Sequence, residues 1–186
     1  MTRTLGRRQA LAAGAAGAVV ALAGGAGLVE AGVLPGRTRV GRLLGACGGD
    51  DPFGMLLEEL LPLLSGLGLR TGPARVGVLG WSMGGAGALR LAEASPDRLA
   101  AVAATSPAVA PDGPEVAGAG RLAGLAVRVD CGANDPFADA TRALAGRLPD
   151  APVTVAKGCH DAAFWQQRAP GQLRFLADAL AGPQPQ

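Results

Sequence analysis

The sequence predicts an α/β domain whose mostly parallel sheet has about four strands. Short apolar runs alternate with segments of helical periodicity, which is typical of parallel strands joined by crossover helices. With 186 residues, of which 49% are hydrophobic, the chain is long enough for one buried core. We place this domain at residues 52–182, after a leader (1–34) and a connector (35–51) and before a short tail (183–186).

Composition and charge exclude several classes of function. The chain has no Tyr, 3% aromatic residues and a net charge of +2, with no dense basic cluster outside the N-terminus, so a nucleic-acid groove is not expected. Three Cys without a CxxC pair, and a single His, argue against a structural zinc site. We therefore expect neither a metal nor a cofactor.

The leader has the features of an export signal. The pair Arg7-Arg8 precedes a mildly hydrophobic run that carries no charge until Glu30, a pattern typical of twin-arginine signals. Ala21-Leu22-Ala23, with a small residue at each end, offers a cleavage site. We expect export to the cell envelope or the outside. A retained membrane anchor is the alternative, because the run is just long enough to span a bilayer.

The segment before the first predicted strand favours a helix at residues 52–64. A proline suits its first position, Asp50 or Asp51 can cap it, and leucines recur along it. Residues 65–66 are expected to end the helix. Pro62 is expected to kink it, because proline lacks the N–H of an intrahelical hydrogen bond.

Four apolar runs bounded by Gly or Pro then predict strands, and the intervening segments predict helices. Strands are expected at residues 75–79, 99–104, 126–131 and 152–156. The remaining elements are a tight turn at 80–85, helices at 86–94, 137–148 and 162–181, the last broken at Pro170, and a Pro- and Gly-rich loop at 107–120.

Residues 80–84 read Gly-Trp-Ser-Met-Gly, a GxSxG sequence. A buried strand precedes it and a helix follows it, as a nucleophile elbow requires. Such a turn exposes the Ser82 hydroxyl, and Gly80 and Gly84 leave room for the strand and the helix to approach. The turn also aims the Met83 N–H at a developing oxyanion. The alternative is a glycine-rich turn with an incidental serine.

A serine hydroxyl needs a base, and the single histidine, His160, is the candidate. It follows the fourth strand, at the edge where parallel sheets hold their sites. Asp135 follows the third strand and is the candidate for orienting the imidazole. Asp130, expected inside a strand, and Asp161, very near His160 along the chain, compete for this role. The alternatives are that Asp135 caps the next helix and that His160 is structural.

These motifs resemble the exported bacterial esterases of the α/β-hydrolase superfamily, which are related to esterase D-like enzymes and mycolyltransferases. The similarity runs from about residue 55 to 180 and rests on residues 80–85, 129–132, 135–137, 160–161 and 164–165. It implies a partial α/β-hydrolase three-layer sandwich and a small-molecule ester substrate. It further implies that Ser82 is the nucleophile, Asp135 the orienting acid and His160 the general base, with the Met83 N–H as half of the oxyanion hole.

The region before residue 75 departs from that family's pattern. Such enzymes place several strands before the elbow strand, and one of them ends in a His-Gly-type loop that supplies the second oxyanion N–H. This sequence has no His-Gly pair. Losing one oxyanion donor costs about 10²–10³ in rate. The strand at 75–79 is then expected at an open sheet edge, where it favours homodimerisation or aggregation.

Cys131 and Cys159 end two strands that are expected to be neighbours. Outside the cytoplasm they are candidates for a disulfide that ties the loops of Asp135 and His160 together. Two buried free thiols are an equal alternative.

The sequence thus predicts a serine hydrolase that cleaves carboxylic esters through an acyl-serine intermediate. An acyltransferase of the same fold is chemically adjacent. A non-catalytic remnant of the fold is the alternative from another class, and a membrane-anchored binding domain would rest on the leader alone.

Overall fold

The computed structural model describes residues 18–22 and 52–182. These residues form a five-stranded parallel sheet in the order β1-β2-β3-β4-β5. The strands are β1 (Ala18–Leu22), β2 (Val76–Trp81), β3 (Ala101–Thr105), β4 (Ala126–Gly132) and β5 (Val153–Ala156). The four strands predicted beyond residue 52 are all present, which confirms the α/β class.

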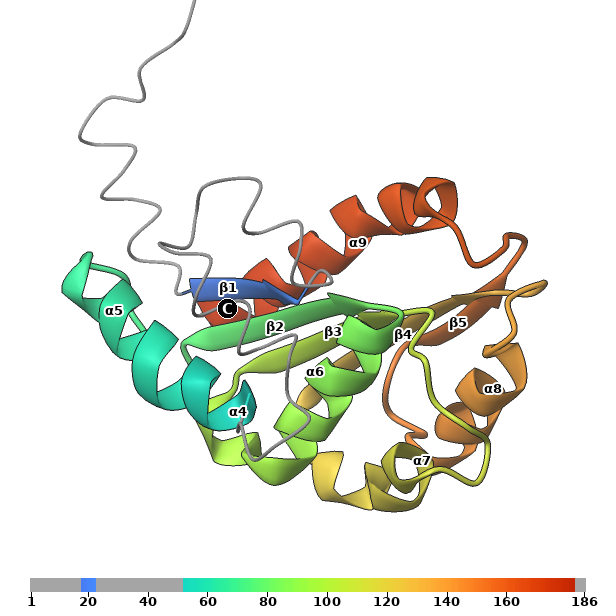
Figure 1. Cartoon of the computed structure of the whole chain (residues 1–186), viewed down its shortest axis with the longest axis horizontal. Helices are drawn as coiled ribbons and strands as arrows, with labels where there is room; N and C mark the ends of the chain where they lie inside the picture. The colour runs from blue at the N-terminus through green and yellow to red at the C-terminus, as the bar shows by residue number, and fades with distance from the viewer. Residues whose placement is uncertain (1–17, 23–51, 183–186) are drawn as a thin grey trace, which may run out of the picture.

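Helices cover both faces of the sheet, so the domain has three layers (Figure 1). α9 (Ala162–Ala181) lies on one face, and α6 (Met83–Ala94), α7 (Pro114–Gly118) and α8 (Ala138–Arg147) lie on the other. The remaining helical elements are α4 (Pro52–Gly54), the π-helix η1 (Met55–Leu60), α5 (Leu61–Gly66) and the 3-10 turns η2 (Pro96–Arg98) and η3 (Ala119–Leu122).

The core is divided between the two faces of the sheet. Val78 and Val102 face α6 and belong to the larger cluster, together with Leu89 of α6. Their strand neighbours Leu79 and Ala103 face α9 in the smaller one. A strand buried on both faces needs a continuous apolar run, which explains why these strands show no alternation of polar residues.

β1 corrects the expectation of an open edge at β2. Residues 18–22 lie inside the predicted leader, yet they pair in parallel with β2 from Ala18↔Val76 to Leu22↔Gly80. The edge strands are therefore β1 and β5, and β2 is internal. Glycines recur throughout the apolar leader, so Gly17 and Gly24 on either side of this segment did not mark it as a separate strand. The rest of the leader, the connector and the tail lie outside the described residues.

Two prolines lie inside continuous helical segments of the structure. The helical run from α4 to α5 continues through Pro62, and η1 just before it has the wider π-helical spacing, with the Leu61 N–H bonded to the Leu56 carbonyl. α9 also continues through Pro170, so the predicted break is wrong. Buried side chains beyond Pro170, such as Leu176, hold the helix against the sheet and compensate for the missing hydrogen bond.

Two smaller corrections concern the loops around the elbow and after β3. The turn predicted at 80–85 is shorter, because β2 extends to Trp81 and α6 starts at Met83. The segment predicted as a loop at 107–120 contains α7, which begins with a proline at its first turn. Within the described ranges, no helix is both long and apolar enough to cross a membrane.

Candidate active site

Ser82 is the single residue between β2 and α6, and its backbone is strained. Its backbone angles are φ 52° and ψ −122°, in the positive-φ region that side chains disfavour. Hydrogen bonds on both sides hold it there. The Ser82 N–H donates to the Thr105 carbonyl at 2.9 Å, and the Ser82 carbonyl accepts the N–H groups of Ala86 (3.1 Å) and Ala108 (3.0 Å). The sheet and the next loop thus fix the serine at a sharp turn.

Glycines make this turn sterically possible. A Cβ at Gly80 would lie 2.1 Å from the Gly84 carbonyl oxygen, so no side chain fits there. A Cβ at Gly85 would lie 3.1 Å from the Pro107 Cα, where contact is also tight. The close approach of β2 and α6 explains why this GxSxG sequence needs glycine ahead of the serine.

Ser82, His160 and Asp135 form one hydrogen-bonded line. The His160 Nε2 lies 2.9 Å from the Ser82 Oγ, and the His160 Nδ1 lies 2.9 Å from the Asp135 Oδ2. The Asp135 side chain is fully buried, whereas a quarter of the His160 side chain is exposed. Because a carboxylate only accepts hydrogen bonds, the fitting tautomer carries its proton on Nδ1 and accepts the serine hydroxyl at Nε2.

Asp135 serves two partners at once. Its Oδ1 accepts the Phe137 N–H at 2.9 Å, which fastens the loop ahead of α8, while its Oδ2 faces His160. Capping of the local backbone and orientation of the imidazole are therefore compatible readings of this residue.

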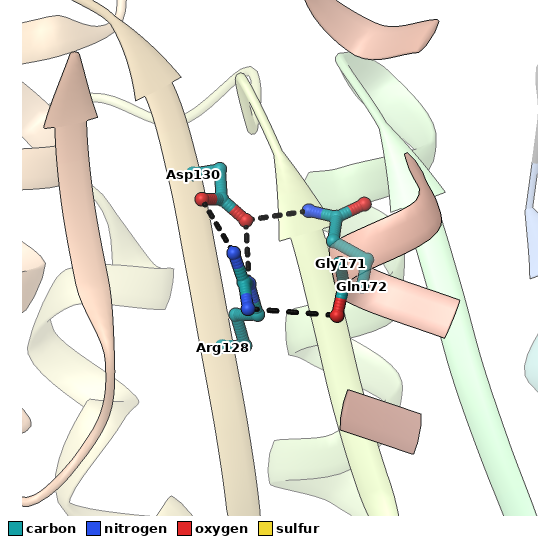
Figure 2. A network of polar contacts seen from close by, with 4 residues as sticks. All are labelled: Arg128, Asp130, Gly171 and Gln172. Atoms are coloured by element: carbon teal, nitrogen blue, oxygen red, sulfur yellow. Dashed lines mark hydrogen bonds and ion pairs between the residues drawn. The ribbon is translucent and has the colours of Figure 1, made fainter. Parts of the chain in front are cut away.

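The two competing carboxylates are engaged elsewhere. Asp130 lies within β4 (Figure 2). Its carboxylate oxygens accept two hydrogen bonds from the Arg128 guanidinium, at 2.8 and 3.2 Å, and one from the Gln172 side chain of α9, at 3.1 Å. The hydrogen bonds with Asp130 raise the pKa of the Arg128 guanidinium above its usual value. Asp161 is the N-cap of α9 and accepts the Phe164 N–H at 2.8 Å. Of the three candidate aspartates, Asp135 is the one in contact with His160.

Backbone contacts hold the loops of Asp135 and His160 together. The Ala133 N–H donates to the Ala156 carbonyl at 2.7 Å, and the Asn134 N–H donates to the Gly158 carbonyl at 3.0 Å. A Cβ at Gly132 would lie 2.6 Å from the Gly158 carbonyl, so the two strands leave the sheet in close contact.

The disulfide considered between Cys131 and Cys159 is not formed. Both residues are free thiols; Cys131 is buried and Cys159 is exposed. Burial of Cys131 raises the pKa of its thiol, which keeps it protonated. The alternative of two buried thiols is also incorrect for Cys159, which is on the surface.

Two aromatic side chains contact the imidazole of His160. The ring of His160 makes T-shaped contacts with Phe137 and Trp165, at centroid distances of 5.3 and 5.1 Å. Met83 follows Ser82 with a largely exposed side chain. The sequence motifs included Phe137 and Trp165, but nothing in their spacing indicated that both would contact the histidine. Among the described residues, no group of His, Cys, Asp and Glu side chains is placed to hold a metal ion.

The arrangement has the chemical requirements of nucleophilic catalysis. An imidazole between a hydroxyl and a carboxylate can take the hydroxyl proton and is stabilised as its cation. The side chain of Ser82 makes no capping bond to α6, so the first N–H groups of that helix are not occupied by it. The positive end of the helix dipole lies at this point, where it favours an anion.

Comparison with known proteins gives a family and a fold. A family model described as "Putative esterase" matches residues 54–181. No curated protein sequence matches the chain. A solved ferulic acid esterase is similar, with a TM-score of 0.58 at 20% identity over 68% of this chain and 60% of that one. S-formylglutathione hydrolase from Staphylococcus aureus has a TM-score of 0.58 at 16% identity over 70% of this chain and 65% of that one.

A third solved structure covers more of the sequence. Ferric enterobactin esterase from Salmonella typhimurium has a TM-score of 0.65 at 21% identity, over 88% of this chain and 51% of that one. At these identities the similarity shows the α/β-hydrolase type of fold. The chain spans between 51% and 65% of the length of these three structures.

Proposed function

We propose that this chain, which belongs to the esterase family whose model matches residues 54–181, is a serine hydrolase that cleaves small-molecule carboxylic esters. Ester hydrolysis is the activity of that family. The observation that carries the proposal is the line from Ser82 through His160 to Asp135, with 2.9 Å at each step. Both distances are within hydrogen-bond reach of a nucleophile, its base and the group that orients the base.

Acylation of the serine is the first half of the proposed reaction. As the Ser82 Oγ bonds to the ester carbonyl carbon, His160 Nε2 takes the hydroxyl proton and the carbonyl oxygen becomes an oxyanion. The bond to the alcohol oxygen then breaks, and the alcohol leaves with the proton from His160. In the second half, water repeats the attack with His160 as base, which releases the acid and restores Ser82.

Asp135 and Met83 are assigned supporting roles. The buried Asp135 carboxylate holds the Nδ1 proton of His160 and stabilises the imidazolium that forms during each half-reaction. The Met83 N–H, at the start of α6, is assigned as one donor to the oxyanion. Its position directly after the nucleophile matches the geometry of a nucleophile elbow.

Two alternatives remain distinct from this proposal. An acyltransferase would use the same acyl-Ser82, with an alcohol in place of water. The observation that speaks for a non-catalytic remnant of the fold is the lack of a His-Gly pair, which would supply the second N–H donor to the oxyanion. We infer slow hydrolysis rather than none, because one missing donor lowers the rate by about 10²–10³ and leaves the remaining catalysis intact.

We also propose that the leader directs export by the twin-arginine route to the cell envelope or the outside, with cleavage near residues 21–23 or retention as an anchor. This rests on the pair Arg7-Arg8 and the uncharged run after it. Export of a reporter fused to the leader, lost in a variant with both arginines changed to lysine, is the expected outcome. Export that is unaffected by that change would contradict the route.

Labelling with a fluorophosphonate probe tests the hydrolase proposal, because such probes react with activated serines. Wild type and the control Ser65→Ala, which alters an exposed serine of α5, are expected to be labelled. Ser82→Ala is expected to lose the label, and His160→Ala to react far more slowly. A folded wild type without label would favour the remnant, and equal labelling of Ser82→Ala would reject the assigned nucleophile.

A further inference from the structure

Two aromatic rings contact the imidazole of His160, and the mechanism above assigns neither of them a role. Phe137 lies with its ring centroid 5.3 Å from that of His160, at an interplanar angle of 67°. Trp165 lies at 5.1 Å, with an angle of 89°. Phe137 directly precedes α8 and Trp165 belongs to the first turn of α9, so the contacts come from two separate elements. T-shaped contacts of this kind are favourable.

Trp165 is itself held in place by the elbow strand. Its ring stacks parallel to that of Trp81, with the centroids 6.4 Å apart and the planes within 5°. Trp81 is the last residue of β2 and precedes Ser82 directly. The side chain that contacts the base is therefore fixed to the same strand that carries the proposed nucleophile.

The backbone around His160 gives it less support than the other two residues of the line receive. The backbone N–H and C=O groups of Ser82 and Asp135 are hydrogen-bonded to neighbouring residues, whereas those of His160 take part in none of the loop and turn hydrogen bonds of the described residues. The ring can move by rotation about its Cα–Cβ and Cβ–Cγ bonds, and such rotation would lengthen the hydrogen bonds of both nitrogens. Contacts from neighbouring rings oppose that rotation.

We propose that Phe137 and Trp165 are positioning residues that keep His160 Nε2 directed at the Ser82 Oγ. This inference rests on the proposed function, since it concerns the base of that reaction. The rate of the reaction depends strongly on the alignment of Ser82, His160 and Asp135, because a displacement of about 1 Å can lower a rate by about 10²-fold. Both rings contact the imidazole, and they take no part in the proton transfers.

Kinetics with p-nitrophenyl acetate test this assignment. Trp165→Leu is expected to lower kcat by about 10- to 100-fold with KM changed less than about two-fold, because the alignment of the base is lost and not the contact with substrate. Trp165→Phe, which retains an aromatic ring, is expected to recover most of kcat. Phe137→Leu, on a separate element, is expected to reproduce the loss should Trp165→Leu fail to fold.

Phe175→Leu is the matched control, because Phe175 lies on the same helix and packs against the α9-facing core without belonging to the site. It is expected to lower the Tm while kcat stays within about two-fold of wild type. Folded Trp165→Leu and Phe137→Leu with unchanged kcat would overturn the inference, as would equal losses in Trp165→Leu and Trp165→Phe. A wild type no faster than Ser82→Ala would instead reject the proposed function itself.

Discussion

Ser82 shows how a strained residue is tolerated at the point where the chemistry is proposed. A positive φ in a residue with a side chain is unfavourable by about 1–3 kcal/mol, and neighbouring structure must hold it in place. Here three backbone hydrogen bonds to β3, α6 and the loop after β3 supply that restraint. Ser106, directly after β3, also has a positive φ, of 48°, so the residues that follow two neighbouring strands both have strained backbones.

Gly80→Ala tests this steric account of the elbow. The new Cβ would lie 2.1 Å from the Gly84 carbonyl oxygen, so β2 and α6 must separate. We expect a loss of about 3 kcal/mol in the free energy of unfolding, measured by urea denaturation, together with loss of fluorophosphonate labelling.

Gly87→Ala is the control on the same helix, because nothing lies within 4 Å of a Cβ at that position. It is expected to raise stability by about 0.5–1 kcal/mol, as alanine favours a helix interior over glycine. Equal stability of Gly80→Ala and wild type would contradict the account.

The two cysteines near the site are expected to differ strongly in reactivity. Cys131 is buried with a raised thiol pKa, whereas Cys159 is exposed. Brief treatment with iodoacetamide at pH 8, followed by peptide mapping, should alkylate Cys159 and leave Cys131 unmodified until the protein is unfolded. A Cys131–Cys159 disulfide in the purified protein, or equal alkylation of both thiols, would contradict the structure.

At the scale of elements, α9 depends on a polar connection to the sheet. Arg128 and Asp130 on β4 contact Gly171 and Gln172 of α9, just beyond Pro170 (Figure 2). Asp130 and Gln172 are fully buried, so loss of the hydrogen bonds of their side chains would destabilise the folded protein. The connection helps to explain why the helix continues past the proline.

Asp130→Asn is expected to destabilise the protein by about 3 kcal/mol, because it leaves a partly buried guanidinium without its charge partner. The free energy of unfolding from urea denaturation gives this value directly. Arg142→Gln breaks the exposed ion pair with Asp139 on α8 and is expected to change stability by less than about 0.5 kcal/mol. Equal changes in the free energy of unfolding for Asp130→Asn and Arg142→Gln would show that the buried contacts of Asp130 do not stabilise the protein.

The sequence predicted the elements that carry the site better than those that complete the sheet. Ser82, Asp135 and His160 each follow an apolar run, and the ends of parallel strands meet at one edge, so their proximity followed from the order of elements. The strand at residues 18–22 could not be separated from the apolar leader, since its partner β2 is distant in sequence. The uninterrupted α9 depends on contacts with β4 that no local pattern contains.

At the scale of the whole molecule, β1 links the leader to the integrity of the sheet. It supplies the neighbour of β2, yet it lies before the predicted cleavage site. Cleavage near residue 23 would therefore expose the backbone N–H and C=O groups of β2, which would then form an open and apolar edge.

A chain that begins at residue 24 is expected to self-associate through that edge. Light scattering after size-exclusion chromatography should give a larger mass for it than for the full chain at the same concentration, and its Tm should be lower. A shortened chain that is monomeric and as stable as the full chain would show that β1 contributes nothing to the sheet.

In this fold, β2 and α6 hold Ser82 at the turn where we propose that it acts as an activated nucleophile. The most direct measurement is kcat/KM for p-nitrophenyl acetate in purified wild type and Ser82→Ala, with both shown to be folded by circular dichroism. We expect measurable hydrolysis by wild type and a loss of at least about 10³-fold in Ser82→Ala. Equal rates in the two proteins would contradict the proposal.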